Sequence, residues 1–386
     1  MKITIVTTNK YPDGDAGAAR QHCLAKALAS KGNTITVLGM GTYTGAALKQ
    51  YGGISYLSLR SKCGGVSGKV LSFLGMQPKL KRYLQHSEAV LVVDAPLTIM
   101  YWLRRYAAKN AILLIHDSVE WYSPEEFSAG KLHFEYLHNS LLNKYWVSGK
   151  VAVIAISHYL QNYFLTKGLS TIRIPPLMDK VSFDCPLYTP SGRTVMVYAG
   201  SPGRKDRLDI FMDGMSRLEN KELSRVVLKI IGTTKEKLVD NCGVPAVLFN
   251  KLGNSLEIVG RIDRDKVLAA LHSADYTILL RDPELRYAKA GFPSKIVESL
   301  SVGVPPLCNF SSDLDCYLTD LENCVEIAGY SAEDVTNAIR RAAAIPDTKR
   351  MEMHRNARRC AEENFDFRLY ADKINDFIVN KRSELL

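Results

Sequence analysis

Short, mainly apolar runs alternate with longer amphipathic segments along the first half of this chain of 386 residues. The runs have the length of buried strands, and the longer segments space their apolar side chains as helices do. This alternation is typical of an α/β fold with a doubly wound sheet. The predicted strands are residues 3–7, 34–38, 89–93, 111–115 and 151–156, and the predicted helices are residues 18–30, 68–84 and 97–107.

The same alternation starts again after a stretch rich in proline and turn residues, which runs from about Pro175 to Gly192. From about residue 332 onward the chain is helical and amphipathic. We therefore expect a second α/β domain of similar size. Its predicted strands are residues 194–198, 226–231, 256–259, 276–280 and 305–307, and its predicted helices are residues 206–218, 265–272 and 294–301.

This organisation predicts two Rossmann-like domains, residues 1–180 and 193–365, joined by a linker at residues 181–192. Residues 366–386 are expected to form a C-terminal helix that packs back on the N-terminal domain. Open α/β sheets bind their ligands at the carboxyl ends of the strands. Both domains are therefore expected to contribute to one cleft.

The charge distribution indicates an anionic partner. The formal net charge is +10, from 50 basic and 40 acidic side chains, and no acid occurs between Asp15 and Glu88. No apolar run reaches the roughly 18 residues of a spanning helix, so a cytoplasmic protein is expected. The eight cysteines form no C-x-x-C pair or Cys/His cluster, and no metal site is predicted.

The segment from Gly291 to Pro306 is a glycine-containing loop that leads directly into a predicted helix. Free N–H groups at such a helix start, together with Lys295, favour binding of a diphosphate. Glu298 lies one turn inside the helix, where it could accept hydrogen bonds from ribose hydroxyls. The alternative interpretation is an ordinary capped helix with a surface glutamate.

A second candidate segment follows the predicted strand 194–198. Arg204 and Lys205 come after a loop of small residues and start the next helix. Cations at a helix N-terminus oppose the helix dipole, so their placement is costly unless an anion is present. A solvated basic turn is the alternative.

Two weaker candidates lie in the N-terminal half. His116 and Asp117 follow the predicted strand 111–115, which would place the histidine at the cleft edge as an acceptor or sugar contact. A buried histidine held by Asp117 is the alternative. Gly17 and Ala18 follow the first strand and allow close approach of the backbone.

In this order and spacing, these segments resemble retaining glycosyltransferases of family GT4, in particular a subgroup with the motif Pro-Ser-Lys. The resemblance covers nearly the whole chain and implies the GT-B architecture of two facing Rossmann-like domains. The pattern departs from the family at two positions. Ala290 stands where a glutamate is usual, eight residues before Glu298, and Ser201 follows Gly200 where an arginine is usual.

The resemblance also implies roles for individual residues. Arg204, Lys205, Ser294 and Lys295 would bind the donor diphosphate, Glu298 the ribose, and Gly260 with Arg261 the base. Gly17, Ala18, Arg281, Gly291 and Phe292 would line the sugar and acceptor cleft, and His116 with Asp117 would be catalytic. The donor would be a UDP-sugar or GDP-sugar, used as substrate without cofactor or metal.

The family further implies a lipid-linked oligosaccharide or glycan acceptor and a role in surface polysaccharide assembly, such as capsule or O-antigen. The basic N-terminal domain, with a segment at 66–84 that mixes apolar and basic residues, predicts peripheral attachment to the anionic inner face of the cell membrane. A sugar-nucleotide epimerase of the same fold is the closest rival. A nucleic-acid-binding protein is less consistent, because no nucleic-acid module is recognisable.

Two other enzyme classes fit the sequence poorly. A dehydrogenase would need a tight G-x-G-x-x-G turn after the first strand, and the loop here is too long. Metal-dependent transferases use an Asp-x-Asp string after a mid-domain strand. The three such strings here, at residues 13–15, 263–265 and 313–315, are interpreted as chance or helix capping.

Overall fold

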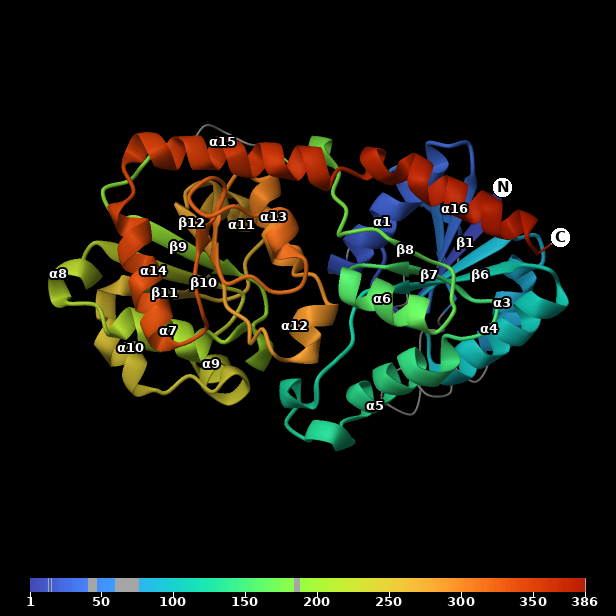
Figure 1. The fold of residues 1–386 in the computed structure, drawn as a ribbon, viewed down its shortest axis with the longest axis horizontal. Coiled ribbons are helices and arrows are strands. Elements are labelled where there is room, and N and C mark those ends of the chain that lie inside the picture. Colours follow the sequence, from blue (N-terminus) through green and yellow to red (C-terminus); the bar gives the residue numbers. More distant parts are fainter. Residues whose placement is uncertain (13, 15, 41–46, 60–75, 184–187, 386) are drawn as a thin grey trace. The chain divides into compact units, whose positions relative to one another are not determined.

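A computed structural model describes the chain except for residues 13, 15, 41–46, 60–75, 184–187 and 386 (Figure 1). The chain forms two compact units. Unit 1 consists of residues 1–122, 134–178 and 366–386, and unit 2 of residues 123–133 and 179–365. The segment 123–133 is thus inserted into unit 2 from the first half of the chain.

Unit 1 is built on an eight-stranded sheet with the order β3-β4-β2-β1-β5-β6-β7-β8. Every pair in the sheet is parallel except β3 with β4. The strands are β1 (Lys2–Thr7), β2 (Thr34–Gly39), β3 (Lys49–Tyr51), β4 (Ile54–Ser58), β5 (Ala89–Val93), β6 (Leu113–Ser118), β7 (Ala152–Ala155) and β8 (Thr171–Arg173).

Helices cover both faces of this sheet, because successive strand residues point to opposite sides. Ile3 and Ile5 share a buried cluster with α1 and α16, whereas α3 packs beside α4 and α4 beside β6 (Figure 1). The helical elements are α1 (Ala16–Ala29), α3 (Met76–Leu84), α4 (Leu97–Lys109), α5 (Phe134–Leu141), the π-helical turn η3 (Leu142–Trp146), α6 (His158–Thr166), η8 (Phe367–Tyr370) and α16 (Ala371–Ser383).

Unit 2 is built on a parallel six-stranded sheet with the order β11-β10-β9-β12-β13-β14. One face carries α7 and α14 over Met196 and Tyr198, and the other carries α11 and α13 over Val197. The strands are β9 (Thr194–Ala199), β10 (Val226–Ile231), β11 (Leu256–Val259), β12 (Tyr276–Leu279), β13 (Pro306–Cys308) and β14 (Val325–Glu326).

The helices of unit 2 connect these strands and close the unit. They are η1 (Pro124–Glu126), η2 (Gly130–Leu132), η4 (Lys180–Ser182), η5 (Arg204–Asp206), α7 (Leu208–Ser216), α8 (Asn220–Leu223), α9 (Lys235–Cys242), α10 (Val247–Leu252), η6 (Gly253–Ser255), α11 (Arg264–His272), α12 (Arg286–Ala290), α13 (Ser294–Ser301), η7 (Leu314–Cys316), α14 (Ala332–Ala344) and α15 (Asp347–Asn364).

The predicted fold class, α/β with two parallel-sheet halves, is confirmed. Two predicted elements differ in detail. The strand expected at 111–115 runs from Leu113 to Ser118, and the helix expected at 206–218 is divided by Arg207, whose φ of 41° is left-handed. Parts of three expected features lie outside the described residues: the acid-free stretch with its segment 66–84, the linker, and the Asp-x-Asp string at 13–15.

No helix in the described part of the chain is long and apolar enough to span a membrane.

A buried ion pair ties α1 to the centre of the first sheet. Arg20 Nη2 lies 2.9 Å from Asp117 Oδ1, and both side chains are almost fully buried. The same guanidinium donates hydrogen bonds to the carbonyl oxygens of Ile174 and Pro175 after β8. Asp117, a candidate from the sequence, is therefore engaged by an arginine of α1.

Replacing Asp117 with asparagine is expected to lower the free energy of unfolding by about 3–5 kcal/mol, because Arg20 would keep its buried charge without a counter-charge. Urea unfolding followed by circular dichroism measures the loss. The matched control is Asp372→Asn in the exposed pair with Lys31, which should change stability by about 1 kcal/mol or less. Equal effects of the two substitutions would contradict this role.

Candidate functional site

The loop after β9 lies directly against the side chain of Lys295 in α13. Gly200, the first residue of the loop, has a φ of 142°, a conformation that L side chains rarely adopt. A Cβ atom at this position would lie 3.0 Å from Lys295 Cε. The fold thus brings together two segments that the sequence marked separately.

Asp206, the last residue of η5, connects these two segments. Its Oδ2 accepts hydrogen bonds from the Tyr198 hydroxyl at 2.8 Å and from the Gly203 amide at 3.3 Å. Its Oδ1 lies 3.5 Å from Lys295 Nζ, and the residue is only 1% exposed. Asp206 was not among the residues predicted from the sequence. Its one signal was an acid three residues after Gly203, the position from which a side chain caps a helix start.

Several cations share this one carboxylate. Burial raises the pKa of Asp206, but the charges of Lys295, Arg281 and Lys205 outweigh burial and hold the pKa below its usual value. Burial lowers the pKa of Lys295, Asp206 opposes this change, and Arg281 and Lys205 add to it. The cluster therefore carries excess positive charge in a half-buried setting, which favours an anionic ligand.

Arg281 follows β12, and hydrogen bonds with Asn309 fix its backbone. Asn309 accepts from the Arg281 amide at 3.0 Å and donates to the Arg281 carbonyl at 2.7 Å. The guanidinium approaches the Gly291 carbonyl at 3.4 Å and lies over the ring of Tyr287, while its buried Nε has no hydrogen-bond partner in the described structure. The structure thus brings Arg281 and Gly291 together.

Phe292 follows Gly291, and its ring is buried against Tyr317 and Phe365, with centroids 5.7 and 5.8 Å away. Only the backbone of this residue is therefore available for a ligand. The side chain instead anchors the loop that leads into α13.

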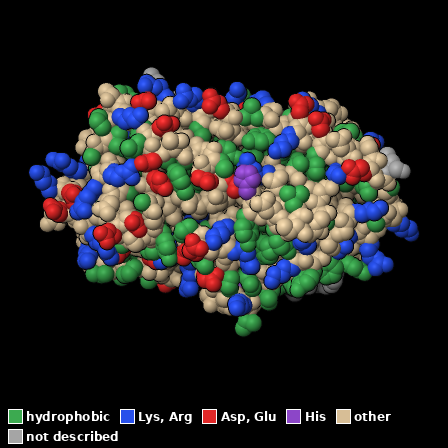
Figure 2. Space-filling view, viewed as in Figure 1, with side chains coloured by type: hydrophobic (Ala, Val, Ile, Leu, Met, Phe, Trp, Pro, Cys, Tyr) green, Lys and Arg blue, Asp and Glu red, His purple; other side chains and the backbone are tan. Residues whose placement is uncertain are grey.

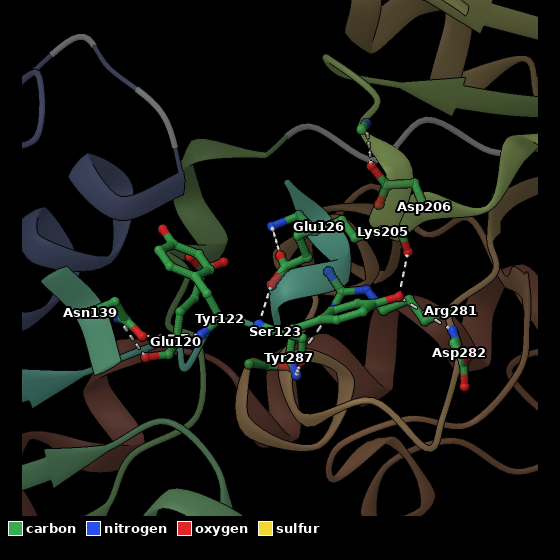
Figure 3. A network of polar contacts seen from close by, with 12 residues as sticks. Glu120, Tyr122, Ser123, Glu126, Asn139, Lys205, Asp206, Arg281, Asp282 and Tyr287 are labelled. Atoms are coloured by element: carbon green, nitrogen blue, oxygen red, sulfur yellow. Dashed lines mark hydrogen bonds and ion pairs between the residues drawn. The ribbon is translucent and has the colours of Figure 1, made fainter. Parts of the chain in front are cut away.

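The inserted segment 123–133 holds Lys205 from the other side (Figure 3). Tyr287 donates two hydrogen bonds: its amide donates to Ser123 Oγ at 3.0 Å, and its hydroxyl donates to the Lys205 carbonyl at 3.0 Å. Glu126 Oε1 lies 4.0 Å from Lys205 Nζ. Glu126, Lys205 and Tyr287 line a cavity of about 280 Å³ together with exposed Arg204. Neither Ser123 nor Tyr287 was predicted, because both act through long-range contacts.

Helix α13 starts at Ser294, directly after Pro293, as predicted. Ser294 and Glu298 are half-buried, and neither side chain has a hydrogen-bond partner in the described part of the chain. Glu298 lines a small cavity of about 20 Å³ beside Lys295. Its carboxylate is therefore available to a ligand.

Glycines form the ends of three adjacent strands. The Gly232 amide after β10 donates to the carbonyls of Val259, the last residue of β11, and of Gly260, at 2.9 and 3.2 Å. A Cβ atom on Gly232 would lie 2.5 Å from the Gly200 carbonyl oxygen, so only glycine fits there. Gly260 and Arg261 are exposed, at the carboxyl end of β11, and no described contact joins Arg261 to the Lys295 cluster.

The remaining candidates lie in unit 1. His116 is buried within β6, its Nδ1 has no hydrogen-bond partner among the described residues, and its ring meets Phe164 edge-on. Burial lowers the pKa of His116 to about 4, against the effect of Asp117, so the imidazole is neutral at neutral pH. Gly17 is half-buried and Ala18 buried in the first turn of α1.

Among the described residues, no group of three or more His, Cys, Asp or Glu side chains is placed to hold a metal ion.

Several solved structures share this fold over nearly the whole chain. Sucrose-phosphate synthase from Thermosynechococcus elongatus is 14% identical with a TM-score of 0.78, and 100% of each chain is covered. HepE from Anabaena, in complex with UDP and glucose, is 17% identical with a TM-score of 0.67 and the same coverage. WaaG, a glycosyltransferase involved in lipopolysaccharide biosynthesis, is 14% identical with a TM-score of 0.68, covering 97% of this chain and 99% of that one. At these identities the likeness defines the fold, which is GT-B.

Residues 186–360, nearly all of unit 2 after its inserted segment, match the sequence model of the family Glycosyl transferases group 1. This match identifies residues 186–360 as a glycosyl transferases group 1 domain, and the chain is a glycosyltransferase. No curated protein sequence matches the chain.

Replacing Asp206 with asparagine is expected to lower kcat/KM by about 10- to 100-fold, because Lys295 loses the group that fixes its position. The substitution also removes the influence that raises the pKa of Lys295, leaving burial, Arg281 and Lys205 to lower it. The alkaline limb of the pH–rate profile should therefore move to lower pH.

The control for this experiment is Asp213→Asn in α7, whose carboxylate pairs with Arg217 at the surface. It should leave both the rate and the alkaline limb unchanged. A lower rate for Asp206→Asn with an unmoved alkaline limb would show that Asp206 does not act through Lys295. Thermal unfolding of each variant reports whether the fold is kept.

Proposed function

We propose that unit 2 binds the nucleoside-diphosphate part of the sugar donor at the cluster of Lys295, Arg281 and Asp206. The observation that carries this proposal is the excess positive charge held beside the start of α13 and the glycine strand ends. Free N–H groups at a helix start and oriented cations together suit a diphosphate. Ser294 and Lys295, with Arg204 and Lys205 from η5, are the proposed diphosphate ligands.

The remaining contacts to the donor are proposed from the places of the residues in unit 2. Glu298 lies one turn inside α13, has no hydrogen-bond partner for its carboxylate among the described residues, and is the proposed ligand of the ribose hydroxyls. Gly260 and Arg261, exposed after β11, are proposed to contact the base. The structures of HepE with UDP and with UDP-glucose support a uridine nucleotide as the first donor to test. Arg281 and the backbone of Gly291 and Phe292 are proposed to meet the sugar.

We propose a metal-independent reaction that retains the anomeric configuration. The bond between the anomeric carbon and the diphosphate oxygen breaks, and the acceptor oxygen forms the new bond to that carbon. The acceptor proton passes to the leaving phosphate. Cations aimed at the developing negative charge contribute roughly 3–4 kcal/mol for each well-placed donor.

Unit 1 is proposed to hold the acceptor, a lipid-linked oligosaccharide or glycan, near Gly17, Ala18 and His116. A neutral imidazole can donate one hydrogen bond and accept another, which suits a sugar hydroxyl. Asp117 would act through the ion pair with Arg20 that fixes β6 against α1. The likeness to WaaG supports a role in the assembly of a surface polysaccharide such as capsule or O-antigen.

Replacing Glu298 with glutamine is expected to weaken UDP binding by about 10- to 100-fold, because a hydrogen bond to a charged group contributes about 1.5–3 kcal/mol. Calorimetric titration with UDP and GDP measures the effect, alongside a transfer screen over UDP- and GDP-sugars. Glu333→Gln, an exposed acid in the first turn of α14, is the control. Unchanged UDP binding by Glu298→Gln would remove Glu298 from the site.

We further propose that unit 1 attaches peripherally to the inner face of the cell membrane. The neighbouring helices α3, α4 and α5 with η3 together carry seven Lys or Arg and a single acid, Glu135. Along α5 and η3, Phe134 is 76% and Tyr145 66% exposed, and Leu137 and Leu141 lie between them at helical spacing. Hydrophobic side chains reach the surface along α5 beside Lys and Arg (Figure 2). Such a surface suits anionic lipid.

Flotation with vesicles of phosphatidylcholine and phosphatidylglycerol tests this attachment. The protein should float at low salt and less at high salt, because screening weakens the charge attraction. Phe134→Ser with Tyr145→Ser should reduce flotation at both salt concentrations, whereas Val247→Ser, a similarly exposed apolar residue of unit 2, should not. If the unaltered protein stays with the soluble fraction at low salt, it has no such attachment.

A further inference from the structure

A second cavity, of about 400 Å³, lies in unit 1 at the amino ends of β6 and β7. Residues 111 and 112 directly precede β6, and Lys150 and Val151 directly precede β7. Parallel α/β sheets bind their substrates at the opposite, carboxyl edge. This cavity is therefore separate from the sheet edge that carries His116. Its walls are Tyr101, Arg104, Arg105, Ala107, Ala108, Ala111, Ile112, Leu114, Ser148, Lys150, Val151 and Leu385.

Among the described residues, three cations and no acid line this cavity. Arg105 Nη1 donates to the Tyr101 hydroxyl at 2.6 Å. Arg104 is half-buried, yet neither it nor Lys150 has a hydrogen-bond or ion-pair partner in the described part of the chain. A half-buried guanidinium with no acceptor has lost part of its hydration without replacement. The arrangement is therefore incomplete without an anion.

Further positively charged side chains lie close to this cavity. Lys167 Nζ donates to the carbonyls of Asn143, Lys144 and Val147 at 3.0, 2.9 and 3.0 Å. Burial lowers the pKa of Lys167, and the charge of Arg104 lowers it further.

Arg382 reaches the same wall from α16. Its guanidinium donates to the Ala111 carbonyl, and its buried Nε has no hydrogen-bond partner among the described residues. The helix dipole of α4 explains cations in its last turns. It does not account for Lys150, Lys167 and Arg382, which come from other elements.

We propose that this cavity is a binding site for a phosphate group on a partly apolar ligand. Arg104, Arg105 and Lys150 supply the charge-assisted hydrogen bonds that phosphate oxygens accept. The side chains of Ala107, Ile112, Leu114 and Val151 form an apolar wall that inorganic phosphate would leave uncovered. The phosphate can come from a lipid headgroup or from a soluble phosphate, and both present the same chemistry to these residues.

The experiment compares the full-length protein with the double variant Arg104→Gln/Lys150→Gln. The control is Lys81→Gln/Arg82→Gln, which removes the same charge from exposed positions of neighbouring α3. Each protein is titrated by calorimetry with inorganic phosphate and with dihexanoyl phosphatidic acid below its micellar concentration. UDP binding is measured in parallel, because it depends on unit 2 and reports separately on the donor site.

The unaltered protein is expected to bind the short-chain phosphatidic acid at least tenfold more tightly than inorganic phosphate. The cavity variant should lose at least tenfold in affinity for phosphatidic acid, with UDP binding unchanged, while the α3 variant stays within about twofold. Binding of both probes with equal affinity identifies a soluble phosphate as the ligand.

Two results would overturn the proposal. One is that neither probe binds to the unaltered protein. The other is that both double variants lose affinity equally, which would show general charge attraction rather than a site. Retained UDP binding and an unchanged thermal unfolding temperature exclude misfolding as the cause of a loss.

Discussion

The buried carboxylate of Asp206 is the interaction on which the positively charged end of the second sheet depends. Tyr198 and Gly203 already donate hydrogen bonds to it at 2.8 and 3.3 Å, and Lys295 Nζ stays 3.5 Å away. A charge-assisted hydrogen bond is normally near 2.7–2.9 Å. The ammonium is therefore held in place without being neutralised, which leaves its charge available to a ligand. A shorter ion pair between Asp206 and Lys295 would have stabilised the unit more, but it would have left less positive charge to bind an anion.

The geometry around this carboxylate follows from parallel strands. Their carboxyl ends meet at one edge, where Gly200, Gly232 and Gly260 end three neighbouring strands without side chains. The charged side chains come from outside this edge: Lys205 from η5, Lys295 from α13, and Arg281 after β12. Because the strand ends carry only glycines and the cations surround them, backbone N–H groups and side-chain charges can approach the same ligand.

Local features of this arrangement could be predicted from the sequence, and contacts over long range could not. The start of α13 at Ser294 was predicted correctly because Pro293 and the apolar spacing after it are local signals. The position of His116 inside β6 was missed because Ser118, Asp117 and His116 are polar, yet they are buried by Arg20 and by packing.

The roles of Tyr287 and of the segment 123–133 had no signal in the sequence. Ser123 and Tyr287 lie 164 residues apart, and only the folded unit 2 joins them.

The two positively charged clusters of the molecule differ in whether they contain a counter-charge. The Lys295 cluster contains its own counter-charge and stays assembled without a ligand, as its proposed role in stabilising a developing charge requires. The described residues around Arg104 and Lys150 include no carboxylate in the cavity wall, so these cations repel one another until an anion binds. A preorganised cluster suits catalysis, because no reorganisation is needed when the charge develops. A cluster without a counter-charge suits the binding of an anion, because the bound anion itself completes the local structure.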